Sequence, residues 1–130
     1  MNLQGKKALV SGGSKGIGKA IARSLLEASA EVLIFSRHEE DLEKVREELG
    51  PDRLHIVEVD QSEDLSPVEK KVKDLWGHLD ILVNNTSVSA GSVKHADIRK
   101  GVDVNVTGYI KLTQLMLPYM KGGHIINIGS

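Results

Sequence analysis

Near the start of the chain stands Ala8-Leu9-Val10-Ser11-Gly12-Gly13-Ser14-Lys15-Gly16-Ile17-Gly18, the stretch that decides its fold. It reads as a short apolar strand, a glycine turn and the first turn of a helix. Its glycines allow a tight backbone turn and place no side chain between that turn and a ligand. A helix that begins near Gly16 directs its free N–H groups into the turn, which predicts a phosphate as the occupant.

Three interpretations of this turn compete. The segment 13–19 almost fits the triphosphate-binding pattern G-x-x-x-x-G-K-S/T, but Ala20 then lacks the hydroxyl that would hold Mg²⁺. The spacing of Gly12, Gly16 and Gly18 instead fits a dinucleotide-binding turn. The third interpretation is a purely structural turn. The remainder of the chain favours the dinucleotide.

Composition excludes several classes of function. The 130 residues carry 17 basic and 18 acidic side chains, a balance that argues against a nucleic-acid surface or a polybasic membrane patch. There is no cysteine, and the 5 histidines have no partner at ligand spacing, so we expect no metal. Because the sequence has no membrane-length apolar run and no secretion signal, a cytoplasmic protein is expected.

Apolar strands alternate with amphipathic helices along the chain. Strands are predicted at 7–10, 31–36, 54–59, 79–84 and 124–128, and helices at 16–29, 39–49, 66–76 and 97–120. This alternation predicts one α/β domain over residues 1–130 with a mainly parallel sheet. Ligands of such sheets bind beyond the carboxyl ends of the strands, where polar or glycine residues follow every predicted strand.

Two helix ends carry specific expectations. Ser66-Pro67-Val68-Glu69 has the pattern of a capping box with proline at the first helical position. The first helix ends near Ser29-Ala30, where no glycine is present to take the left-handed conformation that closes many helices.

Four segments resemble motifs of the short-chain dehydrogenases/reductases. They are 11–18, similar to the cofactor turn T-G-x-x-x-G-I/L-G; 80–85, similar to the start of N-N-A-G; 103–108, with the active-site asparagine; and 125–130, the strand that ends in the catalytic serine. The resemblance implies a Rossmann-like three-layer sandwich with a five-stranded parallel sheet in the order 3-2-1-4-5, C-terminally truncated. It implies an oxidoreductase that moves hydride between a nicotinamide and a carbonyl or alcohol substrate.

The resemblance also implies the residues of the cofactor site. These are Gly12, Ser14, Lys15, Gly16, Ile17 and Gly18 in the turn, Ser36 and Arg37 after the second strand, Asp60 and Gln61 beside the adenine, and Asn85 against the adenosine ribose. For Asn84 and Asn85, side-chain bonds to neighbouring strand ends are an equal alternative.

The catalytic residues implied by the resemblance are Asn105, which would hold a proton-relay water, and Ser130, which would steady the substrate oxygen. The family's catalytic tyrosine and lysine form a Y-x-x-x-K motif after this serine, beyond position 130. The family's Ala-Gly after the paired asparagines is Thr86-Ser87 here, and the span 85–105 is shorter than usual.

No internal tyrosine replaces the missing motif, because Tyr109 is followed at four residues by Thr113, and Tyr119 by Gly123. We therefore expect the 130 residues to be the cofactor-binding portion of an oxidoreductase, without turnover of their own. The alternative is a non-catalytic nucleotide-binding or interaction module.

The end of the second strand decides between the two nicotinamide cofactors. A carboxylate there would bind the ribose hydroxyls of NAD(H), but this position is Ser36. Arg37 follows at once, and Lys15 precedes Gly16, so two cations are expected beside a 2′-phosphate. NADP(H) is therefore favoured over NAD(H), with weak affinity. The alternative is that both cations are solvated surface charges.

The last predicted strand is apolar and would lie at the open edge of the sheet. Ile125, Ile126 and Ile128 are then left uncovered, and an apolar edge strand invites pairing with another chain. We expect self-association.

Overall fold

The computed structural model describes residues 2–50, 52–61, 63–85 and 108–128. Its sheet consists of the parallel strands β1 (Lys7–Ser11), β2 (Glu31–Ser36), β3 (Leu54–Glu58), β4 (Ile81–Asn84) and β5 (His124–Asn127). The strand order β3-β2-β1-β4-β5 confirms the predicted order 3-2-1-4-5.

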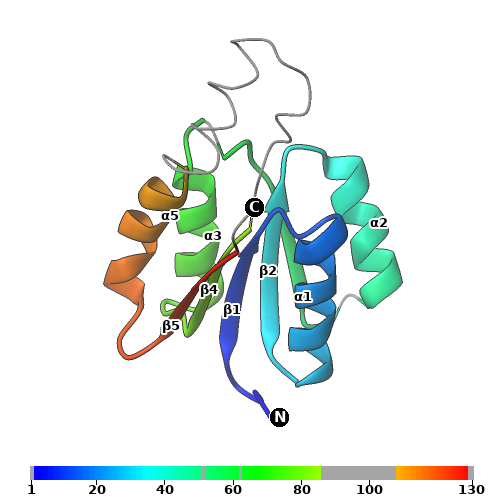
Figure 1. Ribbon diagram of the computed structural model, residues 1–130, viewed down its shortest axis with the longest axis horizontal. Helices are drawn as coiled ribbons and strands as arrows, with labels where there is room; N and C mark the ends of the chain where they lie inside the picture. The colour runs from blue at the N-terminus through cyan, green and yellow to red at the C-terminus, as the bar shows by residue number, and fades with distance from the viewer. Residues whose placement is uncertain (1, 51, 62, 86–107, 129–130) are drawn as a thin grey trace.

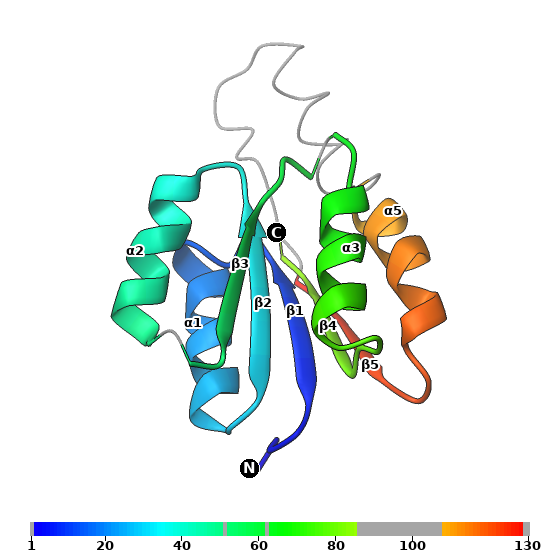
Figure 2. The same ribbon diagram turned by 180° about the vertical axis from the view of Figure 1, so that it is seen from behind.

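Helices cover both faces of this sheet, which gives the predicted three layers. One face carries α1 (Gly16–Glu27) and α2 (Glu39–Leu49), and the other carries α3 (Ser66–Leu75) and α5 (Gly108–Met116), as Figures 1 and 2 show. The predicted helix 97–120 is described only from Gly108. Its α-helical part ends at Met116 because Pro118 lacks the N–H of an interior helical residue, and the chain continues as the short 3₁₀ helix η2 (Leu117–Tyr119).

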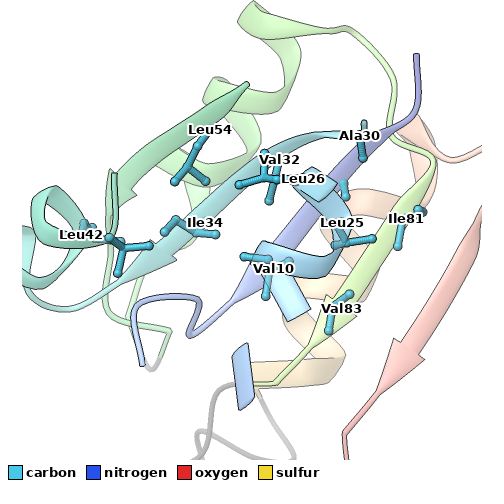
Figure 3. Packing of buried hydrophobic residues seen from close by; sticks show 13 residues of the cluster. Val10, Leu25, Leu26, Ala30, Val32, Ile34, Leu42, Leu54, Ile81 and Val83 are labelled. Atoms are coloured by element: carbon cyan, nitrogen blue, oxygen red, sulfur yellow. The ribbon is translucent and has the colours of Figure 1, made fainter. Parts of the chain in front are cut away.

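Alternate residues of the strands β1, β2, β3 and β4 enter two separate apolar layers. On one face Val10, Ile34 and Leu42 belong to the layer beneath α1 and α2 (Figure 3). On the other face Leu9 and Phe35 pack with residues of α3 and α5. Because both faces are covered, the inner strands read as continuous apolar runs instead of alternating patterns.

The C-terminal end of α1 shows how the chain turns without a glycine. Ser29 takes a left-handed backbone with φ +75°, the conformation that glycine adopts without a steric penalty.

Replacing Ser29 with glycine is expected to raise the free energy of unfolding by about 0.5–1 kcal/mol, because it removes this backbone strain at an exposed position. Urea unfolding measures the change. Ser24→Gly, the same substitution at an exposed position inside α1, serves as the control and should destabilise the protein. Equal destabilisation by both substitutions would contradict the interpretation of Ser29.

The predicted capping box at the start of α3 is wrong. The hydroxyl of Ser66 donates to Asp64 Oδ2 at 2.8 Å, and the Ser66 N–H donates to Asp64 Oδ1 at 2.9 Å. Asp64 lies two residues earlier and competes for the groups that the box would use. The helix therefore begins at Ser66 itself, with Leu65 as the N-cap residue and Pro67 in the first turn.

Near the amino ends of the strands, one carboxylate connects β2 with β1, with β3 and with the C-cap residue of α3. Glu31 of β2 accepts hydrogen bonds from Lys7 Nζ at 3.0 Å, from His55 Nε2 at 2.9 Å and from the indole N–H of Trp76. Burial alone would raise the pKa of Glu31, but these bonds, from Trp76, Lys7 and His55, with the charge of Lys7, lower it from 4.5 to about 2. We call this group the Glu31 cluster.

Candidate functional site

The glycine turn joins β1 to α1 through two positions in the left-handed region. Gly12 has φ +64° and Gly16 has φ +54°, values that residues with a side chain rarely adopt. Nothing lies within 4 Å of a Cβ added at Gly16, so its glycine is required by backbone conformation and not by space.

At Gly13 and Gly18, glycine is required because a side chain has no space there, and not because of the backbone conformation. A Cβ at Gly18 would collide with the carbonyl oxygen of Gly12 and with Asn85 Nδ2, and a Cβ at Gly13 would lie 2.5 Å from Ile34 Cγ2. The turn therefore folds directly onto the start of α1 and onto β2. The role of Gly13 was missed by sequence reasoning, because its neighbour Ile34 is distant in the chain.

Hydrogen bonds fix the turn to the end of β4. Ser11 Oγ donates to the carbonyl of Val83 at 3.2 Å and accepts the N–H of Asn85 at 2.8 Å. Asn85 Nδ2 donates to the carbonyl of Gly12 at 3.3 Å. The side chain of Asn85 thus bonds to a neighbouring strand end, as the alternative interpretation expected, while the residue also lines the hollow described below.

The side chain of Asn84, like that of Asn85, donates hydrogen bonds to neighbouring elements of the fold. Its Nδ2 donates to Asn127 Oδ1 at 2.8 Å on β5 and to Thr113 Oγ1 at 3.2 Å on α5. The buried Asn84 side chain therefore connects β4 to β5 and to α5.

A hollow of about 390 Å³ opens at the carboxyl ends of β1, β2 and β3. All the predicted cofactor residues line it except Gly18, which lies behind the turn; the lining is Gly12, Ser14, Lys15, Gly16, Ile17, Phe35, Ser36, Arg37, His38, Asp41, Val59, Asp60, Gln61 and Asn85. Its volume lies within the range of small-molecule sites.

Among the described residues that line the hollow, two are cations, Lys15 and Arg37, and two are carboxylates, Asp41 and Asp60. Lys15 Nζ lies 3.3 Å from Asp41 Oδ2 in the first turn of α2. Arg37 forms no ion pair with any side chain in the described ranges. Sequence reasoning missed Asp41, although its place in the first turn of α2, near Arg37, was a signal that could have pointed to it.

Two buried polar side chains at the hollow lack hydrogen-bond partners in the part of the chain that the structure describes. One is the hydroxyl of Ser36 at the end of β2, and the other is the amide of Gln61. The Gln61 amide packs against the start of α5, where a Cβ at Gly108 would lie 2.9 Å from Gln61 Nε2. Ser36 places a neutral group where a carboxylate would bind ribose hydroxyls.

The predicted catalytic residues Asn105 and Ser130 lie outside the described residues, as do Thr86 and Ser87. Both tyrosines of the chain are described, and each is engaged elsewhere. Tyr109 donates its hydroxyl to the carbonyl of Ile128 at 3.3 Å, and burial raises the pKa of this phenol. Tyr119 bonds to Glu69 on α3.

This arrangement places a glycine turn, a helix N-terminus and cationic side chains around one hollow at the carboxyl edge of a parallel sheet. Backbone N–H groups at the start of α1 and the charges of Lys15 and Arg37 favour an anion there. The fold is Rossmann-like, and the hollow lies at the edge of the sheet where ligands of this class of fold bind.

The family model described as short chain dehydrogenase matches residues 6–130. The match covers almost the whole chain, and the chain therefore belongs to the short-chain dehydrogenase/reductase family of oxidoreductases. Within the described ranges, no helix is both long and apolar enough to cross a membrane.

Curated relatives support this membership at moderate identity. The chain is 35% identical over 138 residues to the 3-oxoacyl-(acyl-carrier-protein) reductase FabG of Vibrio cholerae, covering 100% of this chain and 57% of that protein. It is 33% identical over 133 residues to the NADP-dependent 3-hydroxy acid dehydrogenase YdfG of Escherichia coli, covering 94% of this chain and 53% of that protein. The chain thus spans somewhat more than half the length of these relatives.

Among solved structures, the chain is similar to RhlG of Pseudomonas aeruginosa in an NADP active-site complex. The TM-score is 0.88 at 32% identity, over 99% of this chain and 56% of that one. A short-chain dehydrogenase from Streptomyces avermitilis gives a TM-score of 0.84 at 31% identity, over 96% of this chain and 49% of that one.

Proposed function

We propose that these residues form the NADP(H)-binding portion of a short-chain dehydrogenase/reductase that transfers hydride between the nicotinamide and a carbonyl or alcohol substrate. The observation that carries the proposal is the hollow at the glycine turn, which is lined by Ser36 at the end of β2, by Arg37 after it and by Lys15. Two similar proteins are NADP proteins by name, YdfG and the RhlG complex, which supports the same choice.

The residues present fit a dinucleotide. Gly18 leaves no room for a side chain between the turn and α1, and the helix N-terminus offers free N–H groups to a pyrophosphate. The buried hydroxyl of Ser36, which has no partner among the described residues, is available to a sugar hydroxyl or a 2′-phosphate. A bound nicotinamide dinucleotide would supply the hydride chemistry, while Asn105 and Ser130 are proposed to serve the substrate side.

Arg37 is proposed to select the cofactor, because a guanidinium binds a phosphate through charge-assisted hydrogen bonds. Arg37→Gln is expected to weaken NADP⁺ binding by about tenfold or more and to change NAD⁺ binding less than about twofold. Titration calorimetry with both cofactors measures the two affinities.

Arg46→Gln is the matched control, since Arg46 is an exposed arginine in the last turn of α2, outside the hollow. It should leave both affinities unchanged. Equal losses of NADP⁺ and NAD⁺ affinity in Arg37→Gln would contradict a role for Arg37 in recognising the 2′-phosphate.

Self-association of the 130-residue chain is proposed from the edge strand β5. Ile125 and Ile126 are 40% and 45% exposed on this strand, which ends the strand order of the sheet. Light scattering at tens of micromolar, a concentration at which exposed edges associate, should detect a dimer or larger species.

Ile126→Lys should favour the monomer, because a charge on an edge strand opposes pairing. Ile110→Lys, at an exposed position of α5, should not. A wild-type chain that is strictly monomeric under these conditions would overturn this part of the proposal.

A further inference from the structure

Asp41 is one of two carboxylates that line the hollow, with Asp60, and it pairs with a cation of the hollow. It lines the hollow from the first turn of α2, and its Oδ2 lies 3.3 Å from Lys15 Nζ. The Asp41 side chain is 25% exposed, whereas that of Lys15 is 75% exposed. The carboxylate is therefore held by the helix, and the ammonium is the mobile partner of the pair.

An ion pair as exposed as this one contributes little to stability. The ion pair instead affects ligand binding. While the Lys15 ammonium pairs with Asp41, it is less available to any other anion in the hollow. An incoming phosphate must displace the carboxylate from Lys15 or share the ammonium with it. Displacing the carboxylate costs the Lys15–Asp41 attraction, and sharing the ammonium weakens its attraction for the phosphate.

One backbone donor at the start of α2 is already occupied. The first N–H of the helix, that of Glu39, already donates to Glu58 Oε2 at 2.9 Å. The Glu39 N–H is therefore not free to bind an anion beside α2. Among the described residues that line the hollow, the cations are Arg37, which has no ion pair in the described ranges, and Lys15, which has one.

We propose that Asp41 is a specificity-determining residue that restrains Lys15 and lowers the affinity of the hollow for a 2′-phosphate. It keeps the preference for NADP(H) over NAD(H) smaller than Arg37 and Lys15 together would otherwise produce. This inference rests on the proposed function, because it concerns recognition of the ribose phosphate within the same site.

The test compares adenosine 2′,5′-bisphosphate with 5′-AMP, two nucleotides that differ only in the 2′-phosphate. Titration calorimetry on the full chain is expected to show that Asp41→Asn tightens binding of the bisphosphate by about three- to tenfold and changes 5′-AMP binding less than about twofold. Glu43→Gln removes the same charge from an exposed position of α2 outside the hollow, and it should change neither affinity. Thermal unfolding verifies that each variant is folded.

The same Asp41→Asn substitution made in a Lys15→Gln variant isolates the contribution of Lys15. In Lys15→Gln, the gain from Asp41→Asn should fall to less than about twofold, because the restrained ammonium is no longer present. An undiminished gain in that background would overturn the inference, as would an Asp41→Asn variant that binds both nucleotides as Glu43→Gln does. Failure of the wild-type chain to bind either nucleotide would instead overturn the proposed function, and this inference with it.

Discussion

Gly18→Ala is expected to abolish detectable NADP⁺ binding and to lower the free energy of unfolding by about 2–3 kcal/mol. The added Cβ would collide with the carbonyl oxygen of Gly12 and with Asn85 Nδ2, so the turn and α1 must separate. That separation moves the helix N-terminus away from the hollow and disturbs the hydrogen bond between Asn85 and Gly12. Calorimetric titration and urea unfolding measure the two effects.

Gly16→Ala is the matched control for this substitution. Gly16 has φ +54° but open space around its Cα, so alanine there adds backbone strain of about 1 kcal/mol and no collision. The two variants should therefore differ in stability, with Gly18→Ala the less stable. Wild-type affinity for NADP⁺ in a folded Gly18→Ala variant would contradict the close packing of the turn on α1.

Glu31→Gln is expected to lower the free energy of unfolding at pH 7 by about 2 kcal/mol. The substitution removes the charge that accepts hydrogen bonds from Lys7, His55 and Trp76 in the Glu31 cluster. The effect is smaller than the full pKa shift would imply, because the Glu31 side chain is 27% exposed. Trp76 is the only tryptophan of the chain, so its fluorescence during urea unfolding reports on this cluster.

The lowered pKa of Glu31 predicts that the free energy of unfolding depends on pH. The pKa of Glu31 is about 2 in the folded protein and 4.5 as the unperturbed value, so the ionised group contributes its full stability above pH 4.5. That contribution is lost as the pH falls from 4.5 towards 2. The difference in stability between wild type and Glu31→Gln should therefore narrow over this range. Glu43→Gln, which alters an exposed carboxylate, should stay close to wild type throughout, and a constant gap for Glu31→Gln would contradict the assignment.

The sheet order and most residues of the hollow could be predicted because the family resemblance implied them, and local patterns independently indicated a parallel sheet with polar strand ends at one edge. An apolar run followed by a polar or glycine residue marks the carboxyl end of a strand, and parallel strands bring these ends to one edge. Positions such as Ser36 and Asp60 therefore meet at the hollow although they are distant in sequence.

Contacts between side chains on separate elements could not be predicted in the same way. The pairing of Lys15 with Asp41 depends on how the first turn of α2 packs beside the glycine turn, and no spacing in the sequence encodes it. Ser66 matched a capping pattern, yet Asp64 competes for its hydroxyl. Ser29 adopts a left-handed backbone that sequence propensity assigns to glycine.

The central proposal is that the hollow prefers NADP(H), and calorimetric titration of the 130-residue chain with NADP⁺ and NAD⁺ tests it most directly. Affinities are expected to be weak, with NADP⁺ bound at least about fivefold more tightly than NAD⁺, because the cations Arg37 and Lys15 both line the hollow and would attract a 2′-phosphate there. Binding of NAD⁺ as tight as or tighter than that of NADP⁺ would contradict the proposal.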